Sequence, residues 1–248
     1  MSTNEFSRSG VYEDPPPPYE TLQPVLKQPV SYGATPDFTN VATTAFPLAC
    51  LSGLESLREL DQLNIEMEPI EYCSCSCESF YSYNVKNTFD QNLFTISPVN
   101  STCTSYDMQL FDSFGNPVVL FQRCRECCSG LRIEVTHMHG ALLGTVQLEA
   151  GFLKSAYIVE DGNGQTVFKV KRSRFQFFPK DVDFSIMSAD GSQEVGKITW
   201  LWSGWMSARH LYKIVFPKDL LVEMKMALLA AWYMMEEDYQ DSHRNRST

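Results

Sequence analysis

The feature that most restricts the fold of this chain is a series of short apolar runs separated by turn signals. Asp, Asn and Gly, which tight hairpin turns favour, stand at four of the junctions. These are Asp90-Gln91-Asn92, Gly115-Asn116-Pro117, Asp161-Gly162-Asn163-Gly164 and Asp190-Gly191-Ser192. Within a run, apolar Leu131, Ile133 and Val135 alternate with polar residues, which predicts one buried face. Because no helical segment separates successive runs, the pattern predicts an antiparallel β-barrel or sandwich and argues against a βαβ enzyme fold.

Helices are expected at both ends of this β region. Leucines at positions 51, 54, 57, 60 and 63 predict a short amphipathic helix that opens the domain. A hydrophobic helix is predicted at about residues 217–236, with Pro217 in its first turn and Asp219 at its positive end. Its apolar stretch, Met226 to Met235, is ten residues long, whereas a membrane span needs about 20. We therefore expect a buried helix on which Trp200, Trp202 and Trp205 pack, with a membrane span as the alternative.

The N-terminal region differs in composition from the rest. Residues 1–48 are rich in proline and poor in aliphatic side chains, which predicts a disordered tail. Residues 49–236 are expected to form one domain and residues 237–248 a polar tail. Within the N-terminal tail, Pro16, Pro17, Pro18 and Tyr19 match Pro-Pro-x-Tyr, the ligand of WW domains. The sequence therefore predicts WW-domain proteins as partners.

The charge of the chain is strongly negative, with 30 acidic and 20 basic residues and a formal charge of -10. This balance opposes delocalised binding to nucleic acid. One dense basic run, Lys169, Lys171, Arg172 and Arg174, precedes three phenylalanines. Such a run predicts a docking edge for anionic lipids, because each basic group near an anionic leaflet contributes about 1 kcal/mol. The alternative is a solvated strand face with the phenylalanines in the core.

The cysteines form two clusters. The first 14 residues lack the apolar core of a secretory signal, so we expect a reducing compartment and no disulfide framework. The clusters are Cys73, Cys75, Cys77 and Cys124, Cys127, Cys128. Acylation, unreactive surface thiols and a thiolate metal site all remain open. For a metal site, Cys124-x-x-Cys127 has zinc-like spacing and could pair with the first cluster or with His137 and His139.

Several passages from Leu51 onward resemble the phospholipid scramblase family, in collinear order over roughly three quarters of the chain. They are Leu60-Asp61-Gln62-Leu63-x-Ile65 with Glu71, Tyr83-x-Val85-Lys86-Asn87-x-Phe89-Asp90-Gln91, Arg123-Cys124-x-x-Cys127-Cys128 with Ile133-Glu134-Val135, Asp181-Val182-Asp183-Phe184-x-Ile186, Gly196-Lys197-Ile198 with Gly204, and Phe216-Pro217-x-Asp219-Leu220-x-Val222-x-Met224-Lys225. The resemblance implies a tubby-like fold, which is a closed antiparallel barrel around a hydrophobic C-terminal helix.

The resemblance also implies a function. It implies a membrane-associated protein that moves phospholipids between leaflets in both directions, without ATP and in response to Ca²⁺, and it implies acylation of the cluster at Cys124. The corresponding calcium loop maps to residues 208–219, where Asp219 is the one carboxylate, although Ca²⁺ prefers six to eight oxygen ligands.

The sequence carries no Gly-rich phosphate loop, zincin motif or nucleophile elbow, so we expect no bond chemistry. We expect attachment to the cytoplasmic face of the plasma membrane or an endomembrane, by lipid anchors and with the C-terminal helix as a further candidate. The alternative function is a docked scaffold that binds lipid and WW domains and scrambles nothing.

Overall fold

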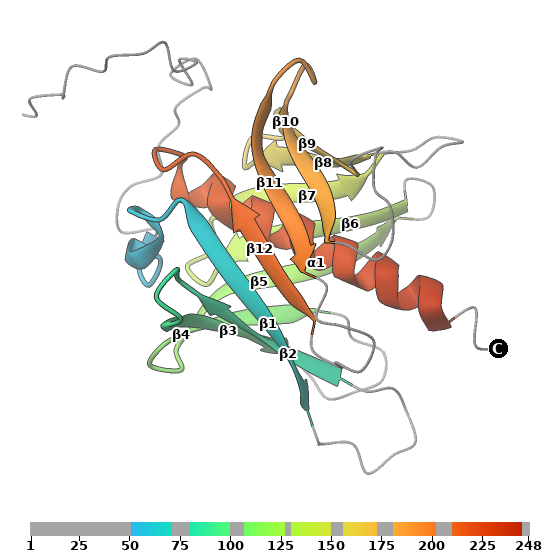
Figure 1. The fold of residues 1–248 in the computed structure, drawn as a ribbon. Coiled ribbons are helices and arrows are strands. Elements are labelled where there is room, and N and C mark those ends of the chain that lie inside the picture. Colours follow the sequence, from blue (N-terminus) through green and yellow to red (C-terminus); the bar gives the residue numbers. More distant parts are fainter. Residues whose placement is uncertain are drawn as a thin grey trace, which may run out of the picture. The chain divides into compact units, whose positions relative to one another are not determined.

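The computed structural model describes residues 51–70, 80–99, 107–126, 130–149, 156–172, 181–201 and 210–244. The predicted disordered tail, residues 1–48, lies outside them. The described residues form a 3₁₀ helix, η3, at Glu55–Leu57, twelve strands and one α-helix (Figure 1). The strands are β1 (Gln62–Ile70), β2 (Phe80–Lys86), β3 (Asn92–Pro98), β4 (Met108–Asp112), β5 (Pro117–Glu126), β6 (Gly130–His137), β7 (Leu142–Leu148), β8 (Ala156–Asp161), β9 (Thr166–Arg172), β10 (Val182–Ser188), β11 (Glu194–Leu201) and β12 (Leu211–Val215), and the helix is α1 (Val222–Arg244).

The strands form a closed up-and-down antiparallel barrel. Each strand pairs with its neighbours in sequence, and β1 closes the ring by pairing with β12, from Gln62 opposite Val215 to Glu66 opposite Leu211. This topology confirms the predicted fold class. Because successive strands reverse direction, the connections alternate between two ends of the barrel. We call the end with the β2–β3, β4–β5, β6–β7, β8–β9 and β10–β11 hairpins the turn end, and the opposite end, where β1, β3, β5, β7, β9 and β11 finish, the loop end.

One hairpin geometry recurs at the turn end. In the β4–β5 hairpin, the Asp112 N–H donates to the Asn116 carbonyl at 2.9 Å, and the Asp112 side chain accepts from the N–H groups of Phe114 and Asn116. A residue with positive φ precedes the second strand in all five hairpins, two positions before it in four and three positions before it in β10–β11. These residues are Asp90, Gly115, Gly140, Gly164 and Gly191. A register shift accompanies each turn, so these are bulged hairpins. The four predicted junctions are therefore confirmed as turns.

The helix α1 fills the barrel (Figure 1). Its residues from Met226 to Met234 are at most 2% exposed. A helix forms readily here because Ala, Leu and Met dominate and neither Gly nor Pro interrupts the segment. Gly144 of β7 has no side chain where α1 approaches the barrel wall closely. An added Cβ would lie 2.6 Å from the Glu160 carbonyl and 3.1 Å from Ala227 Cβ, so a side chain there would displace the helix. The buried-helix prediction is confirmed, and the apolar residues of α1 face barrel side chains.

The bounds of α1 differ from the predicted 217–236. The helix begins five residues later, at Val222, because the preceding residues continue the barrel and then turn: the Phe216 N–H donates to the Asp61 carbonyl at 3.0 Å, and Leu220 N–H donates to the Pro217 carbonyl. It ends later, at Arg244, because its polar second half has partners on the barrel wall. Among the described residues no helix has the length and apolar content of a membrane span.

The predicted short amphipathic helix over Leu51 to Leu63 is wrong in extent. The structure has one 3₁₀ turn at Glu55–Leu57, and Leu63 already lies in β1. A repeat of three residues fits the 3₁₀ period as well as an α-helical face, and Leu51, Leu54 and Leu57 are buried against the barrel. The prediction that Trp200 packs on the terminal helix is confirmed, since its ring centroid lies 5.3 Å from that of Tyr239. Trp202 and Trp205 lie outside the described residues.

Candidate functional site

The second half of α1 carries three consecutive acidic residues, Glu236, Glu237 and Asp238, at the loop end. Consecutive helical side chains point about 100° apart, so each acid meets a different part of the wall. Glu237 Oε2 accepts from Arg123 Nη1 of β5 at 2.9 Å, and both side chains are largely buried. Asp238 Oδ2 accepts from the hydroxyl of Tyr157 of β8 at 3.1 Å. These contacts hold the helix against β5 and β8.

Glu236 is the most buried of the three acids, with 1% exposure. One carboxylate oxygen accepts from the Tyr212 hydroxyl, and the other faces His210 Nδ1 at 3.3 Å and Gln240 Nε2 at 2.7 Å. Burial raises the pKa of Tyr212 and the negative charge of Glu236 raises it further, so this tyrosine keeps its proton and donates it to the hydrogen bond. The cluster joins β12 to the helix in the interior.

At the turn end a single lysine performs the corresponding role. Lys225 is fully buried, and its Nζ lies 2.7 to 3.2 Å from four backbone carbonyl oxygens, which share its three N–H donors. They belong to Leu57, Arg58, Leu60 and Lys218. Burial lowers the pKa of Lys225, and the nearby carboxylates of Asp219, Glu59 and Asp61 oppose that effect. Lys225 therefore ties the entry segment and the β12–α1 turn to the first turn of the helix.

The segment that maps to the family's calcium loop does not have the geometry of a calcium site in its described part. From His210 to Phe216 it is strand β12 with its flanking residues, and Tyr212 and Ile214 point inward. His210 and Tyr212 are engaged by Glu236. Asp219 is exposed in the turn after the strand and is the one carboxylate of residues 210–219. One exposed carboxylate falls far short of six oxygen ligands, so these residues do not fit Ca²⁺ by themselves.

The barrel places further lysines beside the predicted docking run. Lys171 of β9 lies opposite Ser185 of β10, which lies opposite Lys197 of β11, so the two lysines flank one serine in a row across the sheet. Lys213 of β12 occupies the next row, opposite Thr199. Lys169 and Arg172 belong to the same strand as Lys171, and Arg174 lies outside the described residues. Lys197 pairs with Asp183 at 3.2 Å. We call Lys169, Lys171, Lys197 and Lys213 the basic wall.

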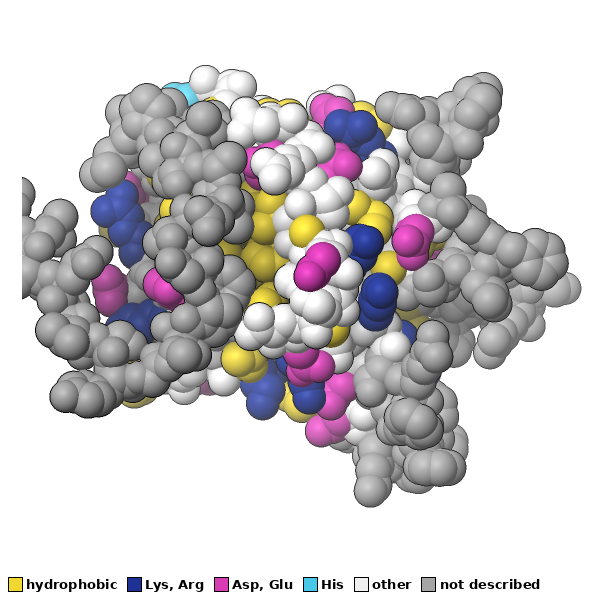
Figure 2. Space-filling view, turned by 90° about the horizontal axis from the view of Figure 1, so that it is seen from above, with side chains coloured by type: hydrophobic (Ala, Val, Ile, Leu, Met, Phe, Trp, Pro, Cys, Tyr) yellow, Lys and Arg dark blue, Asp and Glu magenta, His cyan; other side chains and the backbone are white. Residues whose placement is uncertain are grey.

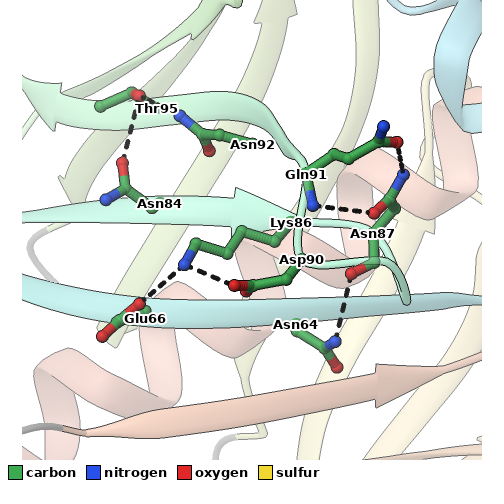
Figure 3. A network of polar contacts seen from close by, with 9 residues as sticks. All are labelled: Asn64, Glu66, Asn84, Lys86, Asn87, Asp90, Gln91, Asn92 and Thr95. Carbon is green, nitrogen blue, oxygen red and sulfur yellow. Dashed lines mark hydrogen bonds and ion pairs between the residues drawn. The ribbon is translucent and has the colours of Figure 1, made fainter.

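Elsewhere on the barrel, basic side chains such as Lys86 and Arg132 are also paired with acids, as Lys197 is with Asp183. On the outer face of β1–β3, Lys86 Nζ lies 2.9 Å from Glu66 and 3.1 Å from Asp90, and Asn84, Asn92 and Thr95 extend the polar network (Figure 3). Figure 2 shows basic groups in small clusters next to acidic ones on the face seen from above. Any basic surface of this acidic protein is therefore local.

The predicted thiol and histidine sites fare differently. Cys124 is half-buried in β5, while Cys73, Cys75, Cys77, Cys127 and Cys128 lie outside the described residues. His137 is buried: its Nε2 lies 2.9 Å from the Ser52 carbonyl and its Nδ1 accepts from the His139 N–H. Because both ring nitrogens are occupied, His137 does not fit the role of a metal ligand. In the described part of the chain no three metal-binding side chains come together.

The fold defines the class of closed antiparallel β-barrels whose interior is filled by a C-terminal helix, here held by polar contacts at both ends. The sequence model of the Scramblase family matches residues 40–242, and the chain belongs to this family. Human phospholipid scramblase 4 is 25% identical over 247 residues, covering 90% of this chain and 75% of the relative. Mouse phospholipid scramblase 1 and bovine phospholipid scramblase 2 are each 27% identical, covering 86% of this chain and 70% and 80% of the relatives. A solved structure from Arabidopsis thaliana is 16% identical and covers 74% of this chain and 96% of its own, with a TM-score of 0.43.

Sequence reasoning missed the roles of Glu236, Lys225 and Arg123. One signal in the sequence was the presence of charged residues at both ends of an otherwise apolar helix. A lysine in the first turn is unfavourable with respect to the helix dipole, so Lys225 indicates that other groups bind it. The partners themselves lie on distant strands. Lys197 and Lys213 were missed because they join the predicted basic run only through strand pairing.

Proposed function

We propose that this protein acts on phospholipids at the cytoplasmic face of a membrane, moving them between leaflets without ATP and without bond chemistry. The observation that carries the proposal is the family match over residues 40–242, together with relatives named phospholipid scramblases. The barrel fold supports it as the fold that the family resemblance implied.

The loop end is the part of the protein that we propose to face the membrane. The chain between β1 and β2 contains Cys73, Cys75 and Cys77, and the chain between β5 and β6 contains Cys127 and Cys128. Both connections join strands at the loop end, because β1 and β5 finish there and β2 and β6 begin there. Strand β9 also finishes at this end, at Arg172. Two or more acyl chains at one end would anchor the protein stably, whereas one would not. The lysines of the basic wall lie on β9, β11 and β12, which all reach this end, and would contact anionic headgroups.

The path of the lipid is proposed to lie outside the barrel. Side chains of α1 fill the interior, so a headgroup finds no polar track through it. We propose that residues 208–219 do not supply a calcium response, since Tyr212 and His210 serve the buried Glu236 cluster and Asp219 stands alone among the described residues of that segment. A calcium response of the protein would need other ligands.

The filled interior also favours a second function, a docked scaffold that binds anionic lipid and recruits WW-domain proteins through Pro16 to Tyr19. Lipid scrambling by purified protein separates the two. Symmetric liposomes carrying a fluorescent phospholipid are treated with dithionite, with and without Ca²⁺. Quenching beyond the outer-leaflet half supports scrambling. Quenching that stops at half in sealed liposomes with the protein shown to be bound contradicts it and favours the scaffold.

The WW-ligand proposal has its own test. A peptide of residues 11–24 should bind isolated WW domains, because the polyproline segment and the tyrosine ring fit their aromatic grooves. Tyr19→Ala should abolish this binding. Equal binding by the Tyr19→Ala peptide would refute the assignment and leave the lipid proposal untouched.

A further inference from the structure

Two phenylalanines at the turn end are almost fully exposed. Phe89 in the β2–β3 hairpin is 82% exposed and Phe114 in the β4–β5 hairpin is 88% exposed. They are the most exposed large hydrophobic residues in the part of the chain that the structure describes. Phenylalanine side chains offer large apolar areas that are normally buried in a core or an interface. Their exposure at two hairpin tips needs an explanation outside the fold.

The turns themselves do not require an aromatic residue. Phe89 and Phe114 occupy the same turn position, the third residue, whose N–H donates to the side chain of Asn87 in one hairpin and of Asp112 in the other, both at 2.9 Å. In the β8–β9 hairpin the same position is Asn163, and its N–H donates to Asp161 at 2.9 Å. The backbone and the first residue of the turn complete the geometry with either side chain. The two aromatic rings therefore serve something other than the turn.

The two tips lie side by side. Strands β3 and β4 pair directly, with Phe94 opposite Asp112, so the two hairpins are neighbours on the rim. The centres of adjacent hairpins are two strand spacings apart, roughly 10 Å. The next hairpin along, β6–β7, carries Met138, which is 46% exposed. A short extended segment of three or four residues would span the two rings.

The charge around the tips is negative. The Asp90 carboxylate is 84% exposed, and the hydrogen bonds from the β4–β5 turn lower the pKa of Asp112, so it stays ionised. Glu55 of η3 is also close to this rim. Its carboxylate accepts from the Gly53 N–H at 2.9 Å, and Gly53 lies against the side chain of Val118, just after the β4–β5 turn. The one lysine here, Lys86, is held by Glu66 and Asp90. An anionic leaflet would be repelled, and the proposed docking end lies a strand length away, roughly 20 Å.

We propose that Phe89 and Phe114, with Asp90 and Asp112, form a docking surface for an arginine-containing cationic segment of a partner protein. A guanidinium group can stack on an exposed aromatic ring and pair with a neighbouring carboxylate at once. The surface is independent of the proposed lipid function and stays accessible when the loop end is on a membrane.

Fluorescence anisotropy of the full-length protein with a labelled 12-residue peptide of alternating Arg and Leu tests this proposal. The peptide should bind, and Phe89→Ser/Phe114→Ser should weaken binding at least tenfold without moving the unfolding midpoint, since both rings bury little. Asn163→Ser, the same turn position in a hairpin without an aromatic residue, should change binding less than twofold. The counterpart with Glu in place of Arg should not bind.

Several outcomes would overturn the proposal. One is absence of binding to the wild-type protein; another is equal affinity in the wild type and the double phenylalanine variant, because binding would then follow the net charge alone. A third is that the double variant loses binding to phosphatidylcholine liposomes while it retains the peptide. In that case the two rings are a membrane contact.

Discussion

The two ends of the barrel hold the central helix by different kinds of contact. At the turn end one lysine, Lys225, contacts four backbone carbonyls, and the connections are short hairpins, four of which share one backbone hydrogen-bond pattern while β10–β11 is one residue longer. At the loop end three acids of α1 reach separate strands, and the connections vary in length, from three residues between β5 and β6 to nine between β1 and β2. These two connections contain five of the six clustered cysteines, and Cys124 lies in β5. The turn end depends on backbone groups, whereas the loop end depends on side-chain pairs.

This difference teaches which end can vary. Carbonyl oxygens are present whatever the side chain, so the segments that contact Lys225 tolerate changes of side chain, whereas the hairpins still need their Asp or Asn acceptor and their positive-φ residue. The loop end requires matched residues on both partners, such as Arg123 with Glu237. The five predictions below test this contrast, in order of decreasing expected effect.

High pH should destabilise the loop-end half first. Burial, followed by neighbouring acids, raises the pKa of Tyr83, Tyr157, Tyr212 and Tyr233 above the ordinary value of 10.0. The folded protein therefore keeps these protons where the unfolded chain has lost them, so the stabilisation is complete below pH 10 and is lost above it. Above pH 10 each tyrosine contributes a slope of about 1.4 kcal/mol per pH unit, or about 5.6 kcal/mol per pH unit for four. Denaturant unfolding between pH 9 and 11 measures the slope. Tyr83→Phe/Tyr212→Phe should halve it, and an unchanged slope would contradict the assignment.

Lys225→Met should cost about 3 kcal/mol of unfolding free energy, because it leaves buried carbonyls without a donor. Urea denaturation of the variant measures the loss. Lys218→Met is the matched control, since the Lys218 side chain is 63% exposed and pairs with an exposed Glu59, and it should change stability by less than about 0.5 kcal/mol. Equal losses in the two variants would show that the four contacts do not hold the turn end.

Arg123→Met should cost about 2 to 3 kcal/mol, because Glu237 would remain largely buried without the opposite charge of Arg123. The control is Arg132→Met on the neighbouring strand, whose pair with Glu134 is 3.6 Å long and more exposed, so that about 0.5 kcal/mol is expected. If Arg123→Met/Glu237→Gln recovered none of the loss from Arg123→Met, the loss would come from packing and not from the ion pair.

Removal of the basic wall should weaken docking without unfolding the barrel. The combined variant should bind phosphatidylserine liposomes more weakly by about 2 to 3 kcal/mol, at roughly 1 kcal/mol or less for each lysine. It carries Lys169→Ser, Lys171→Ser, Lys197→Ser and Lys213→Ser. Co-sedimentation at increasing salt measures it. Lys86→Ser, in the charge-matched network of Figure 3, is the single-site control and should have little effect. Unchanged sedimentation of the combined variant would exclude this face.

Gly115→Ala should cost about 1 kcal/mol. Gly115 has φ of +83° and no atom within 4 Å of an added Cβ, so the change isolates the backbone strain of one turn. Thermal unfolding measures the shift. Gly115→Asn should recover part of the loss, because asparagine tolerates left-handed backbone. A larger loss for Asn than for Ala would mean that the turn position has contacts beyond its φ angle.

Local features of the fold could be predicted from the sequence, and long-range ones could not. The hairpins were predictable because a turn depends on four or five consecutive residues, and Asp161 to Gly164 contain that information. The burial of α1 followed from its short apolar stretch. By contrast, Glu237 lies 114 residues from Arg123, and three of the four carbonyl partners of Lys225 lie 165 to 168 residues away in the sequence.

The start of α1 was missed for a similar reason. Pro217 and Asp219 form a plausible helical first turn by themselves, but the Phe216 N–H still donates to the carbonyl of Asp61, which precedes β1. That contact exists only once the barrel has closed. Similarly, the basic run at Lys169 to Arg172 was visible in sequence, whereas Lys197 and Lys213 join it through the register of β10, β11 and β12.

The placement of α1 after all twelve strands has a consequence for biosynthesis. A ribosome adding roughly 5 to 20 residues per second leaves the chain from Gln62 to Val222 without its central helix for on the order of ten seconds. During that time the inward faces of the strands have nothing to cover them, and β1 has no β12 to pair with. The nascent chain would therefore be a client of chaperones that shield apolar strands, and folding would be completed only after the helix leaves the ribosome.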